Sequence, residues 1–408
     1  MASLLDSLRA HLRSTDDNHR VTSLELLFDL VFVYAITNVT GLMEHDIGEA
    51  TVLEGVIILA VVWFGWCAYT WLGNQAQADE GLLRVAMVVA MGGMFFVAIS
   101  IPHAFEDDGN AAVVLAVAYA VVRLTHLGVY LIAAGDDAEL RSVILGMLGV
   151  AMVMLVLLFA GAVIGGAGQR WWWLAAVAID QLGVYVVRST RWRLNSASHF
   201  AERFGLIIII AIGESIVAVG VATSSAELSG RDALALLCGL AIAVCLWWLY
   251  FDVVAKVAED VLRRSSGIER VRLARDSYTY VHFLFVAGIV FAALGLVVLI
   301  GDHGHVDAGR YALYGGIICY LVGHFLFRLR NVGGINVARA VAGLILLVGI
   351  PTLGGLSALG QIVVPAILLC ALVIFEVRAF HEPRDAIRHR PNESADATVS
   401  GGAALEDS

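Results

Sequence analysis

Charged residues are scarce in this sequence. Aspartate, glutamate, lysine and arginine account for 15% of its 408 residues, while 60% are hydrophobic and the mean hydropathy is +0.83. Soluble globular domains carry a charge on about a quarter of their residues. This composition excludes an ordinary water-soluble enzyme, and the net charge of −10 disfavours nucleic acid as a partner. We therefore expect an integral membrane protein whose partner is the lipid bilayer.

Cysteines and catalytic motifs are equally sparse. The five cysteines all lie in apolar stretches, which argues against a disulfide framework. The sequence contains no His-Glu-x-x-His motif, no phosphate-binding loop and no Gly-x-Ser-x-Gly motif. His303 and His305 in the loop 302–307 are a weak signal for a divalent metal. We expect no metal and no cofactor, and the sequence favours a protein that is not an enzyme.

Twelve stretches are apolar enough and long enough to cross a bilayer, which takes about 20 helical residues. The sequence therefore predicts an all-α, polytopic transmembrane helix bundle. The expected spans are 24–42, 50–72, 81–101, 111–133, 142–165, 171–189, 200–222, 233–256, 277–300, 309–329, 337–357 and 361–380.

The basic residues predict the orientation of these spans. With both termini in the cytoplasm, 21 of the 26 lysines and arginines lie on the cytoplasmic side of the membrane, and three lie on its outer side. Cytoplasmic loops are enriched in these residues, so this orientation is favoured. The expected organisation is a cytoplasmic tail at 1–22, six-helix repeats at 23–195 and 196–381, and a flexible cytoplasmic tail at 382–408.

The two repeats are inferred from matched aromatic and charged positions. Matches among Val, Ile, Leu and Ala are common in lipid-facing sequence and carry little weight. Because each half has an even number of spans, the two copies are expected to be parallel, related by an axis along the membrane normal. The matched pairs are Phe28 with Phe204, Trp66 with Trp247, Tyr69 with Tyr250, His126 with His324, and Arg188 with Arg378.

Three segments resemble a known family. They read Leu24-Glu-Leu-Leu-Phe-Asp-Leu-Val-Phe-Val-Tyr-Ala-Ile36, Ser198-His-Phe-Ala-Glu-Arg-Phe-Gly-Leu206 and Gly213-Glu-Ser-Ile-Val-Ala218. These segments resemble the bacterial low temperature requirement A family, LtrA. The resemblance implies a multi-pass protein of the bacterial inner membrane, and it implies no particular substrate or reaction.

Ionisable side chains within the spans are the candidate functional residues, because each costs roughly 2.5–3.5 kcal/mol at the bilayer centre. Near mid-depth, Arg123 is expected to pair with Asp180 or Glu214, and the alternative role for such a pair is purely structural. His126 shares a helix face with Arg123. A second group lies toward the cytoplasmic end and comprises Glu25, Asp29, His199, Glu202, Arg203, Asp252, His282 and His324.

Carboxylates beside histidine and tyrosine are what a proton-coupled pathway requires, because imidazole titrates near neutral pH. We therefore predict a proton- or ion-linked secondary transporter of an unknown small solute or ion, with a pathway between the first, fourth, seventh and tenth spans. An ion channel with duplicated six-helix units and an intramembrane enzyme acting on lipid are the alternatives. Glu25 and Glu202 could instead be interfacial anchors, and His126 and His324 could hydrogen-bond a neighbouring Tyr or Ser. The sequence leaves open whether the protein forms an oligomer.

Overall fold

The structure is a computed structural model, and it describes residues 20–44, 47–75, 81–106, 110–186, 193–222, 229–301 and 305–379. The predicted tails at 1–22 and 382–408 lie almost entirely outside these residues, and so do 302–304 of the loop with His303. Every long element in the described part is a helix. The α-helices are α2 (Ser23–Glu44), α3 (Glu49–Gln75), α4 (Gly81–Ser100), α5 (Ala111–Ala133), α6 (Ala138–Ile164), α7 (Gly166–Val186), α8 (Ala197–Ala222), α9 (Gly230–Phe251), α10 (Val254–Arg264), α11 (Gly267–Leu273), α12 (His282–Ile300), α13 (Val306–Val332), α14 (Val337–Thr352) and α15 (Ala358–Ala379).

The all-α membrane architecture is confirmed, whereas the number of crossings stays a prediction. A helix lies in each of the twelve predicted ranges. By length and composition, ten of the described helices could cross a membrane. The other two are α14, which has only 16 residues, and α7, which carries Gln169, Arg170 and Asp180. Polar side chains on α7 lower its mean hydropathy, so composition alone does not identify it as a span.

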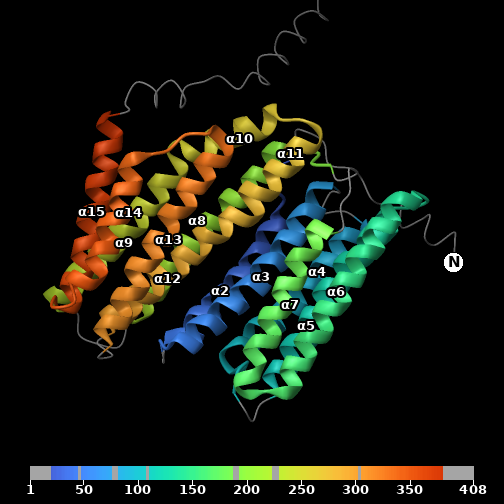
Figure 1. Cartoon of the computed structure of the whole chain (residues 1–408), viewed down its shortest axis with the longest axis horizontal. Coiled ribbons are helices and arrows are strands. Elements are labelled where there is room, and N and C mark those ends of the chain that lie inside the picture. The colour runs from blue at the N-terminus through green and yellow to red at the C-terminus, as the bar shows by residue number, and fades with distance from the viewer. Residues whose placement is uncertain are drawn as a thin grey trace, which may run out of the picture.

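The helices form two groups that lie side by side. In Figure 1, α2–α7 occupy the right of the bundle and α8, α9 and α12–α15 occupy the left. Helices α2 and α3 of the first group pack against α8 and α12 of the second. The short helices α10 and α11 lie at the upper end of the bundle in this view. Residues 274–281, a π-helical stretch, connect α11 to α12.

Helix pairing follows the same pattern in both groups. In the first group, contacts join α2 to α3, α2 to α4, α4 to α5, α5 to α6, α6 to α7, and α3 to α7. In the second group, contacts join α8 to α9, α8 to α12, α12 to α13, α13 to α14, α14 to α15, and α9 to α15. These six pairings therefore recur at the same place in both groups, whereas the contact of α3 with α5 and that of α12 with α15 do not recur to the same extent.

A close glycine contact also occurs at matching positions. A Cβ atom on Gly93 of α4 would lie 3.0 Å from the Ala118 carbonyl oxygen of α5. A Cβ atom on Gly288 of α12 would lie 2.8 Å from the Gly316 carbonyl oxygen of α13. Ala118 and Gly316 each lie eight residues before the matched histidines of these helices, His126 and His324. Small residues at such crossings let two helix backbones approach closely in a membrane.

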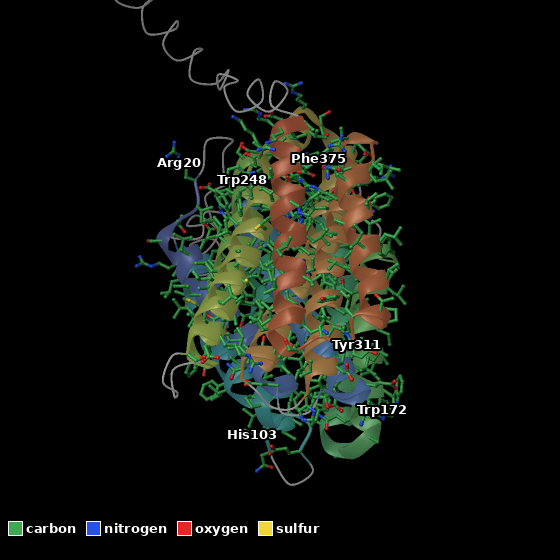
Figure 2. The ribbon with its side chains drawn as sticks, turned by 90° about the vertical axis from the view of Figure 1, so that its left-hand side faces the viewer. Arg20, His103, Trp172, Trp248, Tyr311 and Phe375 are labelled. Atoms are coloured by element: carbon green, nitrogen blue, oxygen red, sulfur yellow. The ribbon has the colours of Figure 1, made fainter. Side chains whose placement is uncertain are left out.

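The surface and the ends of the bundle fit a membrane environment. Large apolar side chains are exposed along the outside of α4, α6 and α14, among them Phe96, Val156 and Leu347. In water such a surface would drive aggregation, whereas lipid solvates it. Figure 2 shows Arg20 at one end of the bundle and His103 and Trp172 toward the other.

Candidate functional site

A buried charged network joins α2 to α8, which come from different halves of the bundle. The Arg203 guanidinium donates to a carboxylate oxygen of Glu25 over 2.8 Å and to Oδ1 of Asp29 over 2.5 Å. None of these three side chains is exposed. Glu25 and Asp29 are four residues apart on α2, so one helix face presents both carboxylates to the same arginine. We call Glu25, Asp29, His199 and Arg203 the inner network.

Neighbouring groups hold the inner network in place. The fully buried His199 lies 3.1 Å from Glu25 through Nε2, four residues before Arg203 on the same helix. The indole Nε1 of Trp66 on α3 donates to Asp29 Oδ1 over 2.7 Å. The backbone N–H of Thr22 donates to Glu25 over 2.9 Å, which caps the start of α2. Asp29 Oδ2 accepts no hydrogen bond within the described part of the chain.

A second ion pair joins α5 to α7 inside the first half. Arg123 donates from Nη2 to Asp180 Oδ1 over 2.6 Å, and both residues are at least 90% buried. Gln181 donates to the other Asp180 oxygen over 3.1 Å. His126 lies one turn after Arg123 on α5, and the rings of Tyr69 and Tyr130 pack against it. Of the two partners expected for Arg123, Asp180 is therefore the one with which it pairs.

Two cavities lie beside these clusters. The first, which we call the vestibule, has a volume of about 240 Å³ and lies between α2, α8 and α12, nearer the ends of these helices that are opposite the inner network. Its polar lining consists of Thr37, Thr40, Glu44, Glu214 and Ser215. The second, which we call the first-half cavity, has a volume of about 800 Å³. Its walls come from α3, α5, α6, α7, α11 and the stretch 274–281, and it contains Arg123, His126 and Asp180. The two cavities share no lining residue.

A third polar cluster occupies the second half. Arg339 on α14 binds both carboxylate oxygens of Glu376 on α15, over 2.8 Å each. Nδ1 of His324 lies 2.8 Å from Arg339, so the hydrogen-bond partner of this nitrogen is an arginine rather than the Tyr or Ser considered from the sequence, although the ring packs against that of Tyr320. A hydrogen bond to tyrosine, which was considered for His126 and His324, is made instead by His282. Its Nε2 lies 2.7 Å from the Tyr250 hydroxyl.

The structure separates the predicted site residues into distinct places. Glu25, Asp29 and Arg203 meet in the inner network, and Arg123, His126 and Asp180 meet at the first-half cavity. Glu214 lines the vestibule instead of approaching Arg123. Glu202 is exposed and accepts a long hydrogen bond from the Val21 backbone N–H, and Asp252 is partly buried at the end of α9. Of the four spans expected to line one pathway, α2 and α8 line the vestibule, α5 lines the other cavity, and α13 lines neither.

Sequence reasoning missed Trp66, Arg339 and Glu376 as members of buried clusters. Trp66 was one of several aromatic residues near a helix end, and nothing in its pattern distinguished a carboxylate partner. Arg339 lies three residues after the helix cap Asn336, where an arginine normally faces the cytoplasm. A signal was present, because Glu376 lies in an apolar helix and an acid there requires a cationic partner.

The apolar helices and the buried charges between them define a multi-pass, all-α membrane protein. The chain belongs to the LtrA family, because the model of the family described as bacterial low temperature requirement A protein (LtrA) matches residues 20–374. The chain is 26% identical to a protein of Rhizobium meliloti (strain 1021) named "Uncharacterized protein RA0937". This similarity extends over 329 residues and covers 76% of this chain and 78% of the relative. No solved structure matches the chain.

Proposed function

We propose that the protein is a proton- or ion-linked secondary transporter, and that a small solute or ion crosses between α2, α8 and α12. The observation that carries this proposal is the arrangement along α2 and α8. One end of this helix pair holds the fully buried inner network, and the other end lines the vestibule. Such an arrangement corresponds to a pathway that is open at one end and closed by ion pairs at the other.

The cost of burying the inner network supports a functional role. Removing charges from water costs several kcal/mol per ion, and hydrophobic side chains of similar size often replace a buried ion pair without loss of stability. Joining two helices through four ionisable side chains with no solvent exposure therefore has a high desolvation free energy. A pair of helices that alternates between a closed and an open arrangement needs contacts that can be broken. Ion pairs meet this need, because a change in the charge of one partner breaks them.

Asp29 and Glu25 are the proposed coupling carboxylates. Protonation of either removes a negative charge that holds Arg203, so it weakens the contact between α2 and α8. Oδ2 of Asp29, which accepts no hydrogen bond in the described structure, is the oxygen available to a proton or a cation. Entry of the coupling ion from the vestibule would then favour opening at the inner network. Glu214, the acid on α8 that lines the vestibule, is the proposed first contact for the ion.

We propose further that the chain crosses a bacterial inner membrane twelve times, with both termini cytoplasmic. The proposed units are the six-helix repeats 23–195 and 196–381. The recurrence of six helix pairings and of the glycine contacts at Gly93 and Gly288 supports two parallel repeats. The inner network would then lie at the cytoplasmic end and the vestibule at the outer end.

Flux measurements on purified protein in liposomes test the transport proposal. The vesicles contain a pH-sensitive dye and are exposed to panels of cations, anions and small metabolites. We expect movement of a solute or of protons in the native protein, and loss of this movement in both Asp29→Asn and Glu214→Gln. Glu202→Gln is the matched control, because this exposed acid on α8 lies outside the network and the vestibule. Folded native protein without flux in any panel would contradict the proposal.

A further inference from the structure

We propose that the first-half cavity binds a small organic anion with an aromatic or aliphatic body. This site is separate from the proposed transport pathway, since it shares no lining residue with the vestibule. Its volume of about 800 Å³ is within the usual range of about 300–1,000 Å³ for small-molecule sites.

The charge of the cavity favours an anion. Its lining includes three arginines, Arg123, Arg272 and Arg275, and two carboxylates, Glu139 and Asp180. Asp180 is already engaged by Arg123 over 2.6 Å. Arg275 contacts Asp276 over 2.8 Å, and Asp276 also contacts Arg330 over 3.1 Å, which is paired in turn with Glu269 over 3.0 Å. Among the residues that line the space, arginines therefore outnumber carboxylates by three to two.

Arg123 lines the cavity, is itself buried and has an incompletely used donor. Only Nη2 of this guanidinium is bonded to Asp180, and its buried Nε has no hydrogen-bond partner within the described part of the chain. A buried N–H without an acceptor is costly, and a carboxylate oxygen of a ligand would satisfy it. At the other end, Arg272 is exposed on α11, where it can attract an anion that approaches from solution.

The walls between these arginines suit an apolar body. Phe64, Trp71 and Tyr280 line the cavity together with aliphatic side chains such as Val143 and Val184. Arg275 is held over the ring of Tyr185, with 4.8 Å from its guanidinium carbon to the ring centroid. An aromatic carboxylate would place its ring against these walls and its charge near an arginine. Inorganic phosphate has the charge but no body to bury.

Ligand-observed fluorine NMR on the purified full chain in nanodiscs tests this proposal directly. The probes are para-fluorobenzoate, its neutral isostere para-fluorobenzamide, and the cation para-fluorobenzylammonium. We expect line broadening for the benzoate alone, reversed by excess unlabelled benzoate and not by inorganic phosphate. Equal binding of the amide or the cation would overturn the proposal, and so would competition by phosphate at equal concentration.

Variants locate the binding. Arg272→Gln removes an exposed charge without disturbing the core, and we expect it to weaken benzoate binding several-fold. Arg123→Gln combined with Asp180→Asn removes both buried charges together, and we expect affinity to fall about tenfold or more, as for loss of a charge-assisted hydrogen bond. The control Arg84→Gln removes an exposed arginine from the first turn of α4 and should bind as the native protein does. If the native affinity persists in the double variant and in Arg272→Gln, the site is elsewhere. Because the readout is binding rather than flux, failure of the transport proposal would leave this result intact.

Discussion

Arg203 on α8 donates a hydrogen bond to Asp29 on α2, and neither side chain has any solvent exposure. The two residues are 174 positions apart and belong to the two halves of the bundle. Their contact therefore ties the halves together through charge rather than through apolar packing alone. A contact of this kind is strong only while both partners are ionised, which makes it sensitive to substitution and to protonation.

Removal of one partner from this contact should destabilise the protein strongly. Breaking a buried pair typically costs about 3–5 kcal/mol, because the remaining charge is left uncompensated. We expect Arg203→Met to lower the thermal unfolding temperature in detergent markedly, since it leaves Glu25 and Asp29 without their shared donor. The double variant Asp29→Asn with Arg203→Met should recover part of this loss. Strictly additive effects would contradict a direct coupling between the two residues.

The adjacent acid on α8 provides a control for that measurement. Glu202 precedes Arg203 in the chain but points to the surface, whereas Glu25 contacts Arg203 directly. We expect Glu202→Gln to leave the unfolding temperature unchanged and Glu25→Gln to lower it. The comparison separates burial in the network from the mere loss of an acid near this helix end.

The partner of Arg123 can be tested in the same way. Arg123→Leu and Asp180→Leu should each destabilise the protein by about 3–5 kcal/mol, and together they should cost less than the sum. Glu214 is the matched control, because it lines the vestibule and does not contact Arg123. Arg123→Leu and Glu214→Leu should therefore be additive within about 0.5 kcal/mol. Non-additivity with Glu214 and additivity with Asp180 would show that the pairing is wrong.

Much of the fold could be predicted from the sequence, because the bilayer imposes a simple rule. Backbone groups in lipid must be bonded within the segment, so a long apolar run becomes a helix. Helix positions were therefore predictable to within a few residues for most elements. The largest differences are about five residues: α7 begins at Gly166 rather than 171, α9 ends at Phe251 rather than 256, and α14 ends at Thr352, next to Pro351, rather than 357. The short helices α10 and α11 were not predicted, since their residues are too polar for a span of their own.

The site was only partly predictable, because helix periodicity shows which residues share a face and not which helix that face meets. The pattern placed Glu25 with Asp29, and it placed Arg123 with His126. It could not decide between Asp180 and Glu214 as the partner of Arg123, since both lie at similar depth. The split into two cavities depends on how α2 and α5 pack against other helices, and that packing is determined by long-range contacts.

The indole of Trp66 should contribute to the inner network through a single hydrogen bond. Its Nε1 donates to Asp29 over 2.7 Å, while its ring packs against Phe204. Trp66→Phe keeps much of the packing and removes the donor, so we expect a loss of about 1.5–3 kcal/mol, as for hydrogen bonds to charged groups. Trp171→Phe is the control, because that indole is 61% exposed. Similar unfolding temperatures for the two variants in detergent would contradict a role for the Trp66 bond.

The close contact between α12 and α13 at Gly316 should tolerate no added methyl group there. A Cβ atom there would lie 2.3 Å from the backbone nitrogen of Ala292 and 2.7 Å from the carbonyl oxygen of Gly288, so the helices themselves would have to move apart. Overpacking of this kind costs about 1–3 kcal/mol or more. We expect Gly316→Ala to lower the unfolding temperature.

The neighbouring glycine, Gly315, provides a matched control for this prediction. A Cβ atom on Gly315 would meet no other atom within 4 Å, although the residue lies on the same helix turn. Alanine is preferred over glycine in a helix interior by about 0.8–1.0 kcal/mol. Gly315→Ala should therefore leave the unfolding temperature unchanged or raise it, whereas Gly316→Ala should lower it. If both glycines accept alanine equally, the helices are not in contact at Gly316, and the glycine match between α4–α5 and α12–α13 loses its support.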